Sequence, residues 1–203
     1  MKFMNTEIDN LTMQETLQAI DRLIQEDRST YVVTPNVDHI VQLEKSKELQ
    51  AVYENASLIL TDGKPLLWIA KWYGTPIKEK ISGSDLFPLL CDMAAKKGYK
   101  MFFLGAAEGV ADKAAENLEN KFKGLQVVVS SFINAKTLSL IYSHFSSGKK
   151  EKNLEKKTRC LTALISAGLE EPYFSKFFSH FFILTVESIN NNDERYCFFL
   201  REK

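Results

Sequence analysis

The sequence has no excess of either charge. Its 203 residues contain 26 Lys and Arg against 26 Asp and Glu, so the formal net charge is zero. General nucleic-acid binders usually carry a basic excess, and we therefore do not expect a nucleic-acid partner. The composition, 45% hydrophobic and 26% charged, is typical of a globular protein. This length suits one domain with a sizeable core.

Cysteine and histidine are scarce. The three cysteines, Cys91, Cys160 and Cys197, form no C-x-x-C pair, which argues against zinc and thioredoxin-like sites. Scattered, unpaired cysteines favour a reducing compartment. The three histidines lack the spacing of a metal-ligand set, so we expect no metal and no cofactor.

Long apolar runs are missing as well. No stretch reaches the roughly 18 uninterrupted apolar residues of a transmembrane helix, and the first ten residues lack the apolar run of a signal peptide. The nearest candidate span, residues 173–186, is rich in aromatics but is interrupted by Ser175, Lys176, Ser179 and His180. We expect it to be a buried or interfacial segment.

Strand-like and helix-like patterns alternate through the first 130 residues. Helices are predicted over 11–26, 36–53, 65–73, 82–97 and 109–123, and strands over 30–34, 57–61, 100–105 and 126–130. This alternation predicts an α/β fold with a parallel sheet and helices on both faces. Ligands gather at the carboxyl ends of such strands, so the chemistry is expected just after Thr34, Thr61, Gly105 and Ser130. Beyond residue 131 the pattern blurs, and no elements are predicted for the last forty residues.

Polar turns follow the first two strands. Asn36 offers an amide donor and a carbonyl acceptor beside free helix N–H groups, which suits a sugar hydroxyl or a phosphate. Asn36 could equally be a helix cap alone. Asp62 follows a buried-looking strand and could act as a general base if burial raises its pKa. A capping role for Asp62 is the alternative.

Two further turns and a charge run complete the candidates. Lys80 precedes Ser82-Gly83-Ser84 at a helix start, a pattern that could cradle a pyrophosphate. A capping turn with a solvated lysine explains it almost as well. The turn at Gly105 could touch a nucleotide, although it is neither a dinucleotide fingerprint nor a P-loop. The run over 146–152 is typical of solvated charge.

Order and spacing make these segments informative together. The chain resembles the WecG/TagA/CpsF glycosyltransferases over roughly residues 1–130, in VVTPNVDHIVQL (32–43), LILTDGKPLLWIAKWYG (58–74), EKISGSDLF (79–87) and MFFLGAAEGVADKAAENL (101–118). The resemblance implies an α/β sandwich with a Rossmann-like core. It also implies metal-independent transfer of a sugar, in the best-known branch N-acetylmannosamine, from a UDP-sugar to an undecaprenyl-diphosphate-linked acceptor. That reaction belongs to cell-wall and surface polysaccharide synthesis.

The resemblance also implies residue roles. Asp62 matches the proposed catalytic base, and Thr34 and Asn36 match residues lining the pocket. Lys80 stands where the family usually has arginine, which keeps the charge and loses the bidentate fork. In the later turn Lys150 replaces a glutamine. The predicted site is therefore catalytic Asp62 with the substrate-binding residues Thr34, Asn36, Lys80, Gly83, Ser84, Gly105, Lys150 and Glu151.

The C-terminal third departs from the family pattern. Glu170-Glu171-Pro172 stands in place of a glycine-rich turn, and the arginine-rich membrane appendage is reduced to residues 194–196 and Arg201. We expect a glycosyltransferase domain over 1–168 and a diverged segment over 169–203, with residues 1 to about 130 as the stable core. The resemblance implies a cytoplasmic enzyme, peripheral on the inner face of the cell membrane, for which a homo-oligomer is left open. The alternative is an inactive truncated or frameshifted paralogue that folds without transferring sugar.

Overall fold

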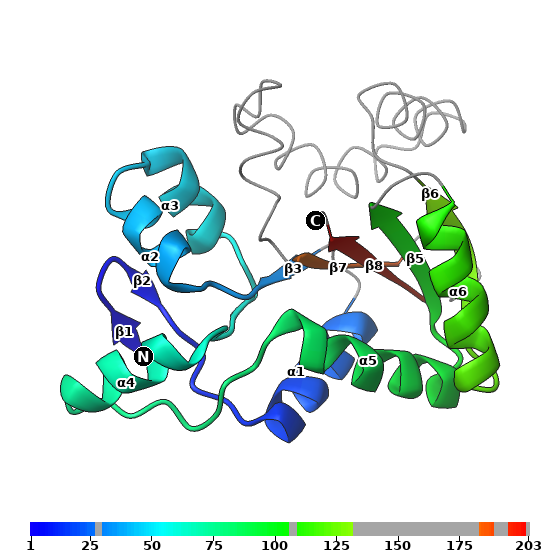
Figure 1. The fold of residues 1–203 in the computed structure, drawn as a ribbon, viewed down its shortest axis with the longest axis horizontal. Helices are drawn as coiled ribbons and strands as arrows, with labels where there is room; N and C mark the ends of the chain where they lie inside the picture. The colour runs from blue at the N-terminus through cyan, green and yellow to red at the C-terminus, as the bar shows by residue number, and fades with distance from the viewer. Residues whose placement is uncertain (27–29, 106–108, 132–182, 189–194, 202–203) are drawn as a thin grey trace.

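The computed structural model describes residues 1–26, 30–105, 109–131, 183–188 and 195–201 (Figure 1). The helices are α1 (Met13–Gln25), α2 (Val37–Leu43), α3 (Lys47–Glu54), α4 (Lys64–Trp72), α5 (Gly83–Lys97) and α6 (Val110–Lys121). The strands are β1 (Lys2–Phe3), β2 (Thr6–Glu7), β3 (Thr30–Val33), β4 (Leu58–Ile59), β5 (Lys100–Gly105), β6 (Gln126–Ser131), β7 (Ile183–Ser188) and β8 (Arg195–Arg201).

The main sheet has six strands in the order β4-β3-β7-β8-β5-β6. The predicted α/β fold with parallel strand pairs is confirmed, since β3 pairs in parallel with β4 and β5 with both β6 and β8. The sheet is nevertheless mixed and not wholly parallel, because β7 is antiparallel to β3 and to β8. Only residues 189–194 separate β7 from β8, and a parallel connection needs a dozen or more residues.

The strands near the carboxyl terminus have no counterpart in the sequence-based prediction. β7 and β8 occupy the centre of the sheet and join the β4-β3 pair to the β5-β6 pair. The described sheet is therefore not complete within residues 1 to 130. The expectation that residues 1 to about 130 form the stable core stays a prediction, as does the division at residue 168.

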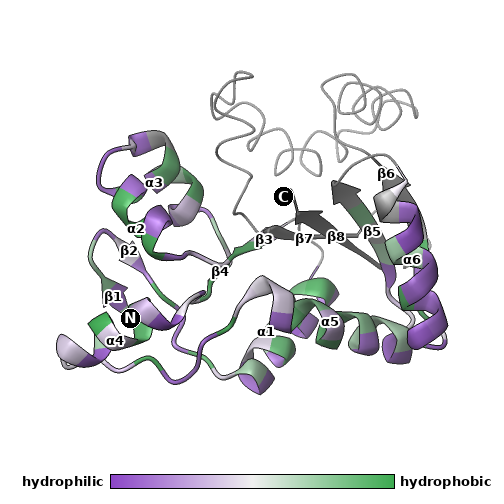
Figure 2. Ribbon diagram, viewed as in Figure 1, coloured by the Kyte–Doolittle hydropathy of each residue, from purple (hydrophilic) through white to green (hydrophobic). Residues whose placement is uncertain are grey.

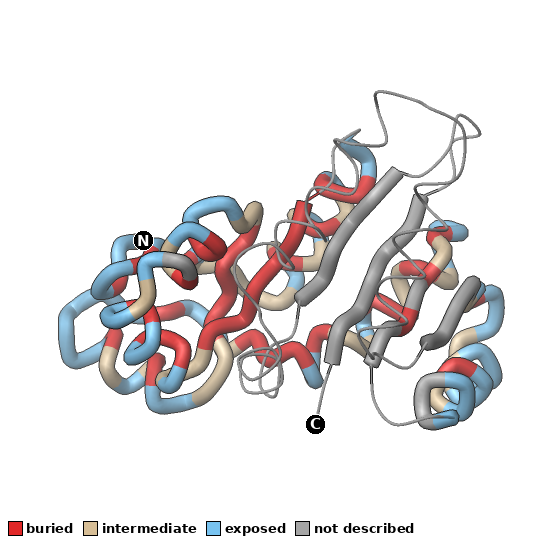
Figure 3. The backbone as a smooth tube through the Cα atoms, turned by 90° about the horizontal axis from the view of Figure 1, so that it is seen from above, coloured by how far each residue is buried: buried red, intermediate tan, exposed pale blue. Residues whose placement is uncertain are grey.

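Helices cover both faces of the sheet at its β3–β4 end. Tyr31 and Val33 pack into one hydrophobic cluster with α2, α3 and α4, whereas Val32 packs into a second cluster with α1 and α5. Side chains of a strand alternate between faces, so the two clusters lie on opposite sides of β3. The residues of β3 and β4 are buried, and Figure 3 shows the exposed residues on the surrounding parts of the chain.

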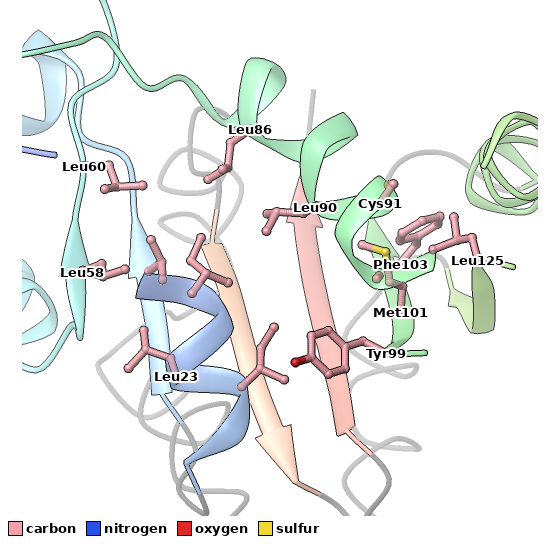
Figure 4. Packing of buried hydrophobic residues seen from close by; sticks show 14 of the residues in the cluster. Leu23, Leu58, Leu60, Leu86, Leu90, Cys91, Tyr99, Met101, Phe103 and Leu125 are labelled. Atoms are coloured by element: carbon pink, nitrogen blue, oxygen red, sulfur yellow. The ribbon is translucent and has the colours of Figure 1, made fainter. Parts of the chain in front are cut away.

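The second cluster fills the space between α1, α5 and the sheet (Figure 4). Leu86 and Leu90 come from α5, Leu23 from α1, and Met101 and Phe103 from β5. The hydropathy colouring shows that α1 and α5 are striped, with apolar residues on one side (Figure 2). Burial of these stripes, together with the Ser82 cap at the start of α5, accounts for the position of α5 under the sheet.

The predicted helix over 36–53 is wrong in one respect, because it is two helices. α2 ends at Leu43, and α3 begins after Ser46, whose side chain accepts a hydrogen bond from the Leu49 N–H at 3.1 Å. Serine competes for backbone groups and favours a cap over a helix interior. The break lets α2 and α3 pack against each other above β3 (Figure 1).

Candidate active site

Three turns meet at the carboxyl ends of β3 and β4. The Asp62 N–H donates to the Pro35 carbonyl at 2.9 Å, and the Ile81 N–H donates to the Thr61 carbonyl at 2.8 Å. These backbone bonds fasten the turn after β3, the turn after β4 and the segment before α5 to one another. Because the two strands are parallel, their carboxyl ends face the same edge of the sheet.

The turn after β3 contributes Thr34 and Asn36. Thr34 is buried, and Asn36 is the N-cap of α2, where its Oδ1 accepts a hydrogen bond from the His39 N–H at 3.1 Å. The capping interpretation of Asn36 is therefore confirmed. The cap occupies Oδ1 and leaves the Nδ2 amide as the part of Asn36 that suits a ligand.

Asp62 is half-buried beside two charged residues. Burial raises the pKa of the Asp62 carboxyl, and the negative charge of Asp85 raises this pKa further. The positive charge of Lys80 and a hydrogen bond from the Gly63 N–H lower it in part. The capping alternative for Asp62 is wrong, because the N-cap of α4 is Gly63 and no side chain caps that helix. A carboxyl group that has a raised pKa and does not cap a helix is suited to accept a proton.

Gly63 holds the chain in a conformation that other residues rarely adopt. Its φ of +97° and ψ of 136° turn the backbone directly from Asp62 into α4. A residue with a Cβ is strained at this φ whatever space surrounds it. The direction of the Asp62 side chain thus depends on a glycine next to it.

Lys80 lies in a small polar chain at the start of α5. Its Nζ is 2.6 Å from Asp85 Oδ2 and 3.4 Å from Ser82 Oγ, and Ser82 Oγ lies 3.0 Å from Ser84 Oγ. The hydrogen bond that Lys80 donates to the Asp85 carboxylate raises the pKa of the Lys80 ammonium. The same bond, together with a hydrogen bond involving the Ser82 side chain, lowers the pKa of Asp85. Lys80 thus stays cationic beside Asp62 and the amino end of α5.

Asp85 is a site residue that the sequence reasoning missed. Its N–H donates to the Ser82 side chain at 3.3 Å, so Ser82 and Asp85 occupy the N-cap and third positions of α5. The spacing Ser-x-x-Asp is a known helix-start pattern and could have identified Asp85 beforehand. Thr61 was also overlooked: its hydroxyl is buried and has no hydrogen-bond partner among the described residues.

The structure brings most of the predicted site residues together. Thr34, Asn36, Asp62, Lys80, Gly83 and Ser84 all belong to the three connected turns. Gly105 ends β5, which is separated from β3 by β7 and β8. β3 and β5 are three strand spacings of about 4.8 Å apart, so Gly105 lies roughly 14 Å from the end of β3 along the carboxyl ends of the strands. Lys150 and Glu151 lie outside the described residues, and within the described part there is no group of three or more metal-ligating side chains.

Comparison with known proteins shows the family of the chain. The model of the WecG/TagA/CpsF family of glycosyl transferases matches residues 1–144, so the chain belongs to that family. A relative in Bacillus spizizenii, an N-acetylglucosaminyldiphosphoundecaprenol N-acetyl-beta-D-mannosaminyltransferase, is 30% identical over 104 residues. That match covers 51% of this chain and 40% of the relative, so the chain matches less than half the length of this relative.

Proposed function

We propose that the chain is an inverting, metal-independent glycosyltransferase that moves N-acetylmannosamine from a UDP-sugar to an undecaprenyl-diphosphate-linked acceptor. Membership of the family supports a transferase, and the activity of the Bacillus spizizenii relative supports this donor sugar and acceptor. The strongest structural support is the environment of Asp62, a half-buried carboxyl whose pKa is raised and which lies beside Lys80 at the carboxyl ends of the strands.

The proposed reaction is a single displacement. The acceptor hydroxyl attacks the anomeric carbon of the donor sugar, the bond from that carbon to the diphosphate oxygen breaks, and UDP leaves. Asp62 accepts the proton of the attacking hydroxyl. A base whose pKa is raised toward the working pH transfers protons more effectively than an ordinary carboxylate, and its position fixes the direction of attack.

The leaving diphosphate gains negative charge and needs stabilisation. In the proposal Lys80 and the free N–H groups of Gly83 and Ser84 at the start of α5 provide it. Lys80 is held at 2.6 Å by Asp85, so the ammonium is positioned before the donor arrives. A lysine supplies a point charge at this place and not the bidentate fork of an arginine.

The remaining predicted residues complete the proposed donor and acceptor site. Thr34 and Asn36 orient the sugar, and Gly105 lies along the same edge where the nucleotide would extend. The two parallel units, β3-α2-α3-β4 and β5-α6-β6, would form a Rossmann-like nucleotide-binding core. Lys150 and Glu151 are proposed donor contacts within a catalytic domain over 1–168. The enzyme would work on the cytoplasmic side, peripheral on the inner face of the membrane.

A transfer assay with the full chain tests this function. UDP-N-acetylmannosamine and a lipid-linked N-acetylglucosamine acceptor are incubated with the protein, and the product is examined by mass spectrometry and NMR. We expect a disaccharide-lipid whose new linkage is inverted relative to the donor. Release of free sugar without a disaccharide would indicate a different nucleotide-sugar enzyme. No turnover of this or other UDP-sugars would favour the alternative that the chain is an inactive paralogue. This alternative is supported by the end of the family match at residue 144.

A further inference from the structure

The outer face of α4 is unusually aromatic for a surface helix. Trp68 and Trp72 on α4 and Tyr73 at its C-cap are 67%, 87% and 73% exposed, and the ring centroids of Trp72 and Tyr73 lie 6.1 Å apart. The opposite side of α4 packs into the core through the buried Leu66 and Ala70. The exposed aromatics are therefore not needed to hold α4 in place, and a contiguous aromatic surface of this kind marks an interaction site.

Two lysines share the aromatic face. Lys64, Trp68, Lys71 and Trp72 occupy positions i, i+4, i+7 and i+8, which lie along one side of a helix. Both lysines are exposed, and neither forms an ion pair with any of the residues that the structure describes. The surface formed by Lys64, Trp68, Lys71, Trp72 and Tyr73, here termed the α4 face, thus combines rings with positive charge.

The α4 face begins next to the candidate catalytic group. α4 follows Asp62 and Gly63 directly and has nine residues, which gives a length of about 13 Å. The helix lies at one end of the molecule beside β1 and β2, far from α6 (Figure 1). Nothing in the described part of the fold covers its outer side.

We propose that the α4 face docks onto the surface of an anionic lipid bilayer and presents the Asp62 site to acceptors held there. The presence of acceptors at the bilayer follows from the proposed function, whereas the docking of the α4 face does not depend on it. Tryptophan and tyrosine favour the interface between headgroups and acyl chains, and lysines beside them are attracted to anionic headgroups. Among the described residues, none of the helices has the length and hydropathy that a membrane span requires.

A second copy of the chain fits the α4 face less well. A two-fold interface brings the same patch of both copies together, so Lys64 and Lys71 would face their own equivalents. Stable dimers also bury about 800 Å² per partner, whereas three aromatic side chains bury roughly 450–750 Å². A bilayer needs no such area, and its negative surface complements both lysines.

Vesicle sedimentation of the full chain tests the proposal. The wild type is compared with Trp68→Ala/Trp72→Ala/Tyr73→Ala on vesicles of phosphatidylcholine with and without phosphatidylglycerol. We expect the wild type to prefer the anionic vesicles and the variant to lose about tenfold or more in partition coefficient. The single variant Trp72→Ala, at the most exposed position, gives a smaller loss in the same direction if the triple variant folds poorly.

Charge variants give an independent readout. Lys71→Gln should weaken binding to the anionic vesicles about fivefold and leave binding to neutral vesicles unchanged. Lys113→Gln on α6 and Leu89→Ala on α5 change exposed residues elsewhere and should have no effect. Absence of wild-type binding, or equal binding by the triple variant, overturns the proposal.

The same variants separate docking from catalysis and from self-association. The triple variant should keep transfer to a water-soluble acceptor and lose transfer to an acceptor embedded in vesicles. Vesicle binding without transfer to any acceptor would support docking and contradict the proposed function. If analytical ultracentrifugation shows a wild-type dimer that the triple variant dissolves, while vesicle binding stays unchanged, the α4 face is a contact between copies and the bilayer proposal is wrong.

Discussion

Replacement of Gly63 by alanine should impair stability and activity for separate reasons. Gly63 has a φ of +97°, and an added Cβ would lie 3.6 Å from Pro65 Cδ, which is an ordinary contact. The penalty therefore comes from the backbone and should be about 1–3 kcal/mol. With a urea m-value of about 2 kcal/mol/M, the unfolding midpoint should fall by roughly 0.5–1.5 M.

Gly98 provides a matched control. It caps α5 with a φ of 73° and has no atom within 4 Å of an added Cβ, so Gly98→Ala pays a similar backbone penalty of about 1–2 kcal/mol. Gly98 lies at the carboxyl end of α5, whereas the site lies at its amino end. Transfer should fall about tenfold or more in Gly63→Ala alone, because the Asp62 side chain is redirected. Equal transfer by the two folded variants would refute the role we give to Gly63.

Three further predictions concern the core, the site and metal. Leu86→Ala should lower the free energy of unfolding by about 2–5 kcal/mol in urea titrations, because Leu86 is fully buried in the cluster between α5 and the sheet; a smaller loss would mean that this cluster is loosely packed. Asp62→Asn should be at least as stable as the wild type at pH 7 in thermal unfolding. Burial raises the pKa of Asp62 above its ordinary value of 3.8, so the contribution of Asp62 to stability is fully present below that pH and is lost as the carboxyl ionises; a clear loss in Asp62→Asn would contradict this sign. Transfer should survive EDTA, since Lys80 and not a metal is proposed to face the diphosphate, and loss that magnesium or manganese reverses would contradict this.

Much of the first 131 residues could be predicted from local patterns. The strand at Thr30 is a run of β-branched and aromatic residues, and Ser82 and Gly98 mark the ends of α5 by capping chemistry that depends only on neighbours in sequence. The break after α2 was missed because the apolar spacing continues from Ile40 to Leu49, while the decisive signal is one serine at position 46.

The strand order could not be predicted in the same way. β7 pairs with β3 although Thr30 and Val186 are far apart in sequence, and no periodicity records such a pairing. The sequence therefore could not give the separation of Gly105 from Asp62, because the two strands between β3 and β5 were not anticipated. Asp62 and Lys80 could be assigned to turns beforehand because the glycines and serines of these turns show in the sequence.

The most direct test of the account is transfer by Asp62→Asn in parallel with UDP binding. Asparagine keeps the shape of the side chain and removes its ability to accept a proton, and Asp92→Asn on the exposed side of α5 is the control for loss of a carboxylate. We predict that Asp62→Asn binds UDP like the wild type in calorimetry and that its transfer rate falls about 10²–10⁴-fold, while Asp92→Asn is unchanged. Wild-type transfer by Asp62→Asn would contradict the claim that Asp62 is the catalytic base.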